Sequence, residues 1–133
     1  MKYLLDTNIC IYIMNRRSLD VIRRFKQFDV GDLGVSAITV SELYYGAQKS
    51  KHPEKNLQRL FQFLMPLEVL SYDEAAADAY GRIRAALEQR GEIIGPLDML
   101  IAAHALSQDL VLVTNNIKEF QRVPGLRVEN WIS

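Results

Sequence analysis

The stretch Tyr3-Leu4-Leu5-Asp6-Thr7-Asn8 is a short apolar run that ends at a carboxylate and passes directly into a helical pattern. Apolar residues then recur at helical spacing, which predicts a buried strand over residues 2–5 and a helix over Thr7–Met14. The same succession of apolar run, polar residue and amphipathic segment returns along the chain. The sequence therefore predicts alternating strands and helices.

The other expected elements follow from hydrophobic spacing and from proline and glycine stop signals. We expect helices over residues 18–28, 39–47, 53–65, 73–89 and 97–108, and strands over residues 32–37, 68–70, 110–113 and 127–129. Strands that alternate with helices favour an α/β sandwich with a short, mostly parallel sheet flanked by helices.

The composition is that of an ordinary globular protein, with 49% hydrophobic and 24% charged residues. A length of 133 residues predicts a single domain over residues 1–133. No apolar run approaches the roughly 18 residues of a membrane span, and the chain begins in a strand pattern rather than in a signal sequence. Since the one cysteine, Cys10, cannot form an internal disulfide, we expect a cytoplasmic protein.

Three carboxylates, Asp6, Glu42 and Asp98, lie where a strand or loop gives way to a helix. In an α/β fold the carboxyl ends of parallel strands and the adjoining helix starts converge on one crevice. Convergence there would create an all-oxygen site suited to Mg²⁺ or Mn²⁺. Asn116 and Glu119 follow the strand over 110–113 and would join this crevice from a fourth segment.

Each of the three carboxylates also has a purely structural interpretation. Asp6 could cap the helix that begins at Thr7. Glu42 could complete a capping box with Thr39, and Asp98 could interact with the dipole of the helix that follows Gly95-Pro96. The sequence permits convergence on a metal site and leaves these interpretations open.

The formal net charge is zero, which argues against a general nucleic-acid binder. Basic residues nevertheless cluster at Arg16-Arg17, at Arg23-Arg24 with Lys26, and in the stretch Lys49–Arg59. Each cluster is a candidate to face a phosphate backbone, although solvated charge runs are common.

Four motifs occur in order along the chain: Leu4-Leu5-Asp6-Thr7-Asn8, Ser41-Glu42-Leu43-Tyr44-Tyr45-Gly46-Ala47, Gly95-Pro96-Leu97-Asp98-Met99-Leu100-Ile101-Ala102-Ala103-His104-Ala105, and Val113-Thr114-Asn115-Asn116 with Glu119-Phe120. Each is weak alone. Together they make the chain resemble PIN-domain ribonucleases of the VapC toxin type, over essentially its whole length. The resemblance implies a PIN-like three-layer sandwich and metal-dependent hydrolysis of RNA.

The resemblance assigns the metal-binding role to three acids, Asp6, Glu42 and Asp98. Of these, Asp6 and Asp98 would ligate Mg²⁺ directly, and Mn²⁺ could substitute for it. The family often has a further aspartate where this chain has Asn116, and Glu119 could compensate, so both are candidate catalytic residues. Thr7 and Thr114 would contact metal-bound water or phosphate.

The resemblance also implies a substrate and two partners. The substrate would be structured RNA, most often transfer RNA cut in a single-stranded loop, with the anticodon loop and initiator tRNA as the expected target. Tyr45, Lys49 and Lys51 are the expected contacts, whereas Tyr44 and His104 lie on apolar stripes and are expected in the core. The partners would be a cognate antitoxin, whose C-terminal segment covers the active-site groove, and a second copy of the chain.

Three alternative functions stay open. A catalytically silent PIN-like module that binds RNA or protein is the main one, because Asn116 removes one charge from the site. A phosphoacceptor receiver domain fits less well, since the strand that ends near Leu70 is followed by Ser71 rather than by an aspartate. A DNA-directed PIN nuclease is disfavoured by the neutral charge.

Overall fold

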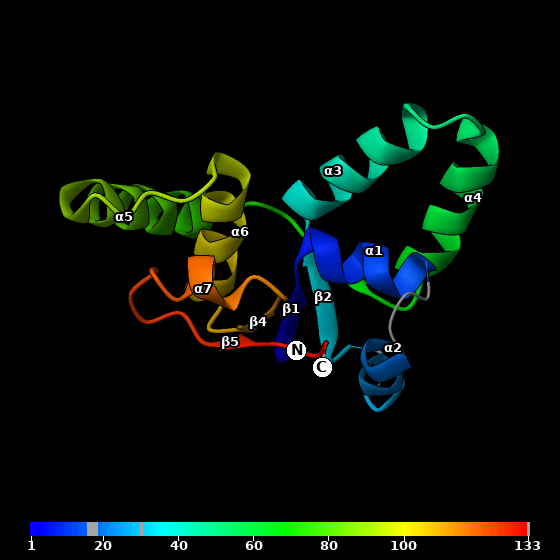
Figure 1. The fold of residues 1–133 in the computed structure, drawn as a ribbon, viewed down its shortest axis with the longest axis horizontal. Coiled ribbons are helices and arrows are strands. Elements are labelled where there is room, and N and C mark those ends of the chain that lie inside the picture. Colours follow the sequence, from blue (N-terminus) through cyan, green and yellow to red (C-terminus); the bar gives the residue numbers. More distant parts are fainter. Residues whose placement is uncertain (16–18, 30, 133) are drawn as a thin grey trace.

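The structure is a computed structural model that describes residues 1–15, 19–29 and 31–132. Helices and strands alternate within these ranges (Figure 1). In chain order they are β1 (Tyr3–Leu5), α1 (Thr7–Asn15), α2 (Leu19–Lys26), β2 (Leu33–Ser36), α3 (Ala37–Gln48), α4 (Pro53–Leu64), β3 (Glu68–Leu70), α5 (Glu74–Arg90), α6 (Pro96–Ser107), β4 (Val111–Val113), α7 (Ile117–Phe120) and β5 (Val128–Glu129). The predicted basic pair Arg16-Arg17 and the predicted start of the second helix at Ser18 lie outside the described residues.

The strands form one parallel sheet in the order β3-β2-β1-β4-β5. β1 is central, and its Leu5 pairs with Val35 of β2 and with Val113 of β4. The carboxyl ends of these three strands therefore lie together at one edge of the sheet. A polar residue ends or follows each of them: Asp6, Ser36 and Thr114.

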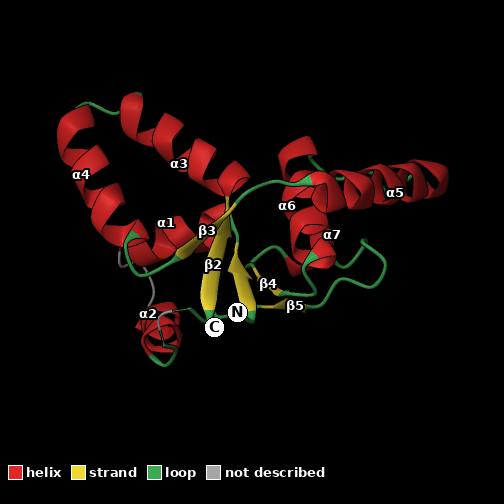
Figure 2. Ribbon diagram, turned by 180° about the vertical axis from the view of Figure 1, so that it is seen from behind, coloured by secondary structure: helices red, strands yellow, loops and turns green. Residues whose placement is uncertain are grey.

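Successive residues of a strand point to opposite faces of the sheet, and β1 separates two hydrophobic cores in this way. Tyr3 and Leu5 pack with apolar residues of α1, α2, α3 and α4. Leu4 packs with α5, α6 and α7 on the other face. Figures 1 and 2 show the two helical layers on either side of the sheet. The predicted α/β sandwich is confirmed, and the sheet is parallel throughout its described strands.

Two features of the fold differ from the prediction. α3 begins at Ala37, two residues before the predicted start, because the Ser36 hydroxyl caps the helix by accepting from the Ile38 N–H at 3.1 Å. The short helix α7 was not expected, since four residues are too few to show a helical period. The other element ends lie within two residues of those predicted. None of the helices that the structure describes has the length and apolar character needed to span a bilayer.

Candidate functional site

Asp6 follows β1 directly and is almost fully buried, with 4% of its surface exposed. Its Oδ1 accepts from the Ile9 N–H at 2.8 Å, so the predicted capping role at the start of α1 is confirmed. Its carboxylate also accepts from the Thr114 hydroxyl. Burial nevertheless raises the pKa of Asp6 to about 6; the hydrogen bonds from Thr114 and Ile9 oppose the rise, and the charge of Glu42 adds to it. Asp6 thus caps the helix, and its burial disfavours the ionised form of its carboxyl group.

Glu42 lies in the second turn of α3 and contacts α1 through Thr7. The Thr7 hydroxyl donates to its Oε1 at 2.8 Å and lies 3.3 Å from the Thr39 hydroxyl. The predicted capping box between Thr39 and Glu42 is wrong, because Ser36 caps the helix and Thr39 is buried inside its first turn. Glu42 is held instead by Thr7 of the first helix, and its charge acts on Asp6.

Asp98 lies in the first turn of α6, beside Glu119 of α7. Burial raises the pKa of Asp98 to about 7, and the charge of Glu119, a hydrogen bond between the two carboxyl groups, and the charges of Asp6 and Glu42 add to the rise. Glu119 also accepts from the Gly95 N–H at 3.0 Å, and it accepts from the Asn116 side-chain amide. The loop before α6 and the turn after β4 are therefore tied together by Glu119.

The site is uniformly negative. None of Asp6, Glu42, Asp98 and Glu119 forms an ion pair with another described residue. As the side chains lie, no group of three histidine, cysteine or acidic residues within the described chain is arranged to hold a metal ion. The chemistry of the donors does fit a hard divalent cation, because all four are carboxylates whose mutual repulsion a positive charge would relieve.

The two predicted threonines have different surroundings. Thr7 is partly exposed, and its hydroxyl donates to Glu42. Thr114 is fully buried, and its Oγ1 also accepts from the Asn116 N–H at 3.0 Å. In this arrangement Thr114 hydrogen-bonds Asp6 from the protein interior and does not face solvent.

The predicted RNA contacts lie on and beyond the outer half of α3. Tyr45 is 67% exposed, and the Lys49 Nζ lies 4.9 Å from the centroid of its ring. Lys51 is exposed in the loop that joins α3 to α4. The core position predicted for Tyr44 is wrong, because this side chain is 47% exposed, whereas the prediction of a buried His104 is confirmed.

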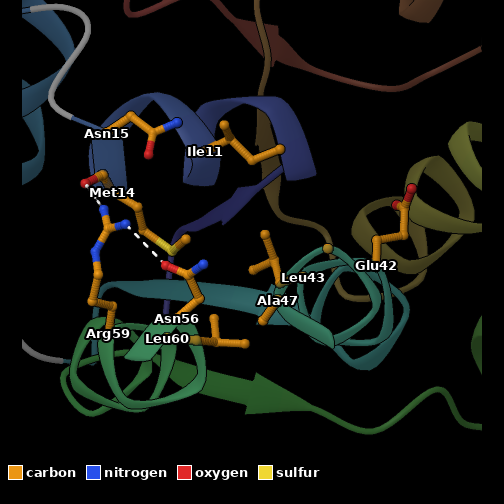
Figure 3. A pocket seen from close by; sticks show the side chains of 10 residues that line it. Ile11, Met14, Asn15, Glu42, Leu43, Ala47, Asn56, Arg59 and Leu60 are labelled. Atoms are coloured by element: carbon orange, nitrogen blue, oxygen red, sulfur yellow. Dashed lines mark hydrogen bonds between the residues drawn. The ribbon is translucent and has the colours of Figure 1, made fainter. Parts of the chain in front are cut away.

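A groove of about 260 Å³ lies between α1, α3 and α4 and reaches Glu42 (Figure 3). Apolar side chains line much of it: Ile11, Met14, Leu43, Ala47 and Leu60. Figure 3 shows Arg59 at the end far from Glu42, where its guanidinium donates to the Met14 carbonyl at 3.0 Å. The sequence did not single out this groove, because its walls come from three helices whose packing no local pattern specifies.

Comparisons with known proteins agree with this architecture. The PIN domain family model matches residues 3–126. Ribonuclease VapC2 of Haemophilus influenzae is 50% identical over 132 residues, which cover 99% of both chains. The tRNA(fMet)-specific endonuclease VapC of Shigella flexneri is 47% identical over 98% of both chains.

A solved structure of DNA-bound VapBC from Salmonella typhimurium matches with a TM-score of 0.94 and 46% identity, covering 98% of each chain. VapBC2 from Rickettsia felis, bound to a DNA fragment from its promoter, matches with a TM-score of 0.92 and 42% identity. The predicted PIN-like sandwich is thereby confirmed. The chain belongs to the PIN-domain family, in which its relatives are VapC ribonucleases.

Proposed function

We propose that this chain is the toxin of a type II toxin–antitoxin module, a Mg²⁺-dependent endoribonuclease that hydrolyses phosphodiester bonds in transfer RNA. The relatives named as ribonucleases support this function over the catalytically silent module. The relative named as a tRNA(fMet)-specific endonuclease makes the anticodon loop of initiator tRNA the first target to test. The observation that carries the proposal is the meeting of four carboxylates at the carboxyl edge of the sheet, with no ion pair to any described residue.

Asp6 and Asp98 would ligate the divalent ion, with Glu42 as the third acid and Mn²⁺ as a substitute for Mg²⁺. A divalent ion held there lowers the pKa of bound water and acts as a Lewis acid toward a phosphoryl oxygen. The chain keeps the acids oriented through neutral donors: Thr114 and the Ile9 N–H fix Asp6, and Thr7 fixes Glu42. Loss of a supporting hydrogen bond of this kind typically lowers metal affinity or activity about 10–100-fold.

Glu119 is the stronger candidate for the fourth position, and Asn116 is its support. Glu119 brings a charge to Asp98 and anchors the N–H of Gly95, whereas Asn116 donates its amide to Glu119. A Cβ atom at Gly95 would lie 3.4 Å from an Asp98 oxygen and 3.8 Å from a Glu119 oxygen. The backbone at Gly95 thus lines the crevice between the two carboxyl groups.

RNA would approach along α3. Glu42, Tyr45 and Lys49 recur at i, i+3 and i+7, so they lie on one face of the helix. Tyr45 offers an exposed ring on which a splayed base can stack, and Lys49 and Lys51 offer charges for phosphates. With Glu42 near the crevice and Lys49 at the far end of α3, an RNA loop bound along this face would have its scissile bond directed toward the crevice.

The first test uses purified protein freed of any antitoxin. It measures cleavage of a bulk transfer-RNA pool in Mg²⁺ or Mn²⁺. Discrete products are expected, and they should vanish with EDTA and in Asp6→Asn. Asp78→Asn, an exposed acid on α5 paired with Arg82, is the matched control and should cleave like the wild type. If folded wild-type protein yields no products, the proposed function is wrong and the catalytically silent binding module is favoured.

The groove between α1, α3 and α4 would receive the antitoxin's C-terminal segment, and an antitoxin arginine reaching the acids would compete with metal. Gly46 lines this groove, and a Cβ there would meet no described atom within 4 Å apart from its chain neighbours and the backbone of its own helix. Gly46→Leu should therefore fold and yet weaken antitoxin binding at least about tenfold, by filling the groove. Gly81→Leu on α5, equally unobstructed, controls for the change in helix propensity. Equal binding by the two variants would refute this location.

Two further expectations complete the proposal. The chain would act in the cytoplasm, where its one free cysteine, Cys10, is buried and reduced. It would also form a homodimer, which light scattering at micromolar concentration tests directly.

A further inference from the structure

His104 is a fully buried residue of α6, as its apolar helical stripe predicts, and it takes no part in the chemistry proposed above. Its Nδ1 lies 2.7 Å from the Ser36 hydroxyl, at hydrogen-bond distance. Its ring meets Tyr72 edge-on, with centroids 5.2 Å apart. Its Nε2 is buried and meets no described residue with good hydrogen-bond geometry, although the ring also has a weaker polar contact with the Ser71 backbone.

The Ser36–His104 contact joins the two helices that carry acids of the site. Ser36 ends β2 and caps α3, and Glu42 follows within two turns of that cap. His104 lies on α6 within two turns of Asp98. The contact also spans 68 positions of sequence, so it connects segments that the chain brings together only on folding. Any shift of the cap relative to α6 would move Glu42 against Asp98.

Stability alone is a poor reason for this pair. The neighbours of His104 on α6 are the buried apolar residues Ile101, Ala102, Ala103 and Ala105, and a buried nitrogen with only a weak polar contact costs free energy. An apolar side chain of similar volume would avoid that cost. Burial lowers the pKa of His104, against the opposing effects of Asp73 and the Ser71 backbone, so the ring is neutral at neutral pH. A neutral, directional hydrogen bond fixes geometry without adding charge near the acids.

We propose that the Ser36–His104 hydrogen bond positions α3 against α6 and thereby sets the separation of Glu42 from Asp98. The inference rests on the proposed function, since it concerns how the same site is assembled. His104 and Ser36 act through the acids, so both are positioning residues. Because the bond is remote from the RNA-binding face of α3, its loss should change turnover and metal affinity rather than RNA affinity.

Three variants test the proposal. His104→Leu keeps the volume and removes the hydrogen bond, whereas His104→Asn keeps an amide atom near the Nδ1 position. Ser36→Ala removes the partner from the other side. Ile83→Ala creates a cavity at a buried residue of α5 that takes no part in this contact, so it controls for lost stability.

We expect His104→Leu to lower kcat on transfer RNA about 10–100-fold and Mn²⁺ affinity about tenfold, with KM for RNA unchanged within about twofold. His104→Asn should retain most of the wild-type kcat and Mn²⁺ affinity. Ile83→Ala should leave both unchanged at a temperature where this variant is folded. Mn²⁺ affinity is measured by calorimetry on the protein without RNA. If His104→Leu fails to fold, Ser36→Ala carries the comparison; because it also removes the cap of α3, the proposal is then supported only by losses larger than those of Ile83→Ala at matched stability.

A folded His104→Leu with wild-type kcat and Mn²⁺ affinity would overturn the inference. Equal losses in His104→Leu and Ile83→Ala would also overturn it, because the effect would then follow stability. Failure of the proposed function looks different: the wild type itself would neither cleave RNA nor bind Mn²⁺.

Discussion

The two ends of β1 are built in opposite ways. Near Tyr3, at its start, lies an aromatic cluster of Tyr3, Phe28 and Trp131, with ring centroids 4.9 to 5.5 Å apart. Beyond Leu5, at its end, lies the acidic crevice of Asp6, Glu42, Asp98 and Glu119. The cluster buries apolar surface, and its Trp131 Nε1–H has a hydrogen-bond acceptor, whereas the crevice brings like charges together.

The charges near each end make the difference plain. Beside the aromatic cluster, Arg24 and Glu129 form an ion pair of 2.8 Å, and the Trp131 Nε1–H donates to the same Glu129 at 3.0 Å. In the crevice, burial and repulsion raise the pKa of Asp6 to about 6 and of Asp98 to about 7. One end of the strand contributes stability, and the other gathers like charges at a cost in stability.

The largest effect is expected from the aromatic cluster. Trp131→Ala removes a side chain that is 3% exposed and should lower the free energy of unfolding by about 3–5 kcal/mol. Urea denaturation measures the loss, and Trp131→Phe, which keeps a ring against Phe28, should lose clearly less. Cleavage by the folded fraction of Trp131→Ala should equal that of the wild type. Lost turnover in fully folded protein would show that the two ends are coupled.

The second effect is a pH dependence of stability in EDTA. The pKa of Asp6 is raised from 3.8 to about 6 in the folded state, so folded protein holds a proton there that the unfolded chain has released. The free energy of unfolding should therefore fall as pH rises through this window, by on the order of 3 kcal/mol from Asp6. Asp98 extends the fall toward pH 7. Mn²⁺ should restore the melting temperature at pH 7.5, and a pH-independent melting temperature would contradict the assignment.

The third effect isolates Asp6. Asp6→Asn removes the charge and keeps an oxygen that can accept from the Ile9 N–H, because asparagine caps helices as well as aspartate does. At pH 7.5 in EDTA the variant should be more stable than the wild type by up to about 3 kcal/mol, and the gain should shrink toward pH 4. It should also be inactive. A variant that is less stable at both pH values would place the Asp6 charge among the stabilising interactions.

The sequence predicts the crevice better than it predicts the contacts that build it. Asp6 and Asp98 could be found because each marks a visible transition into a helix. The start of α3 was misplaced because Thr39 offers as good a local cap as Ser36, and only the strand pairing of Ser36 with Leu70 decides between them. Tyr44 was misplaced because helical spacing gives the direction of the buried face but not its width. α3 buries only Thr39, Leu43 and Ala47, so Tyr44 lies outside that stripe.

The smallest effect is expected at the ion pair beside the aromatic cluster. Arg24 and Glu129 have 42% and 37% of their side chains exposed, and such pairs contribute about 0.2–1 kcal/mol. Arg24→Gln should therefore lose about that much, together with the cation–π contact of its guanidinium, which lies 5.4 Å from the Trp131 ring centroid. The part due to the ion pair should fade between about 50 mM and 1 M NaCl, where screening is strong. Salt should act in the opposite direction at the crevice, because it screens repulsion there. The advantage of Asp6→Asn over the wild type should therefore also shrink in 1 M NaCl, though less, since Asp6 is buried. If salt instead enlarges that advantage, repulsion among the four acids is not what separates the two ends of β1.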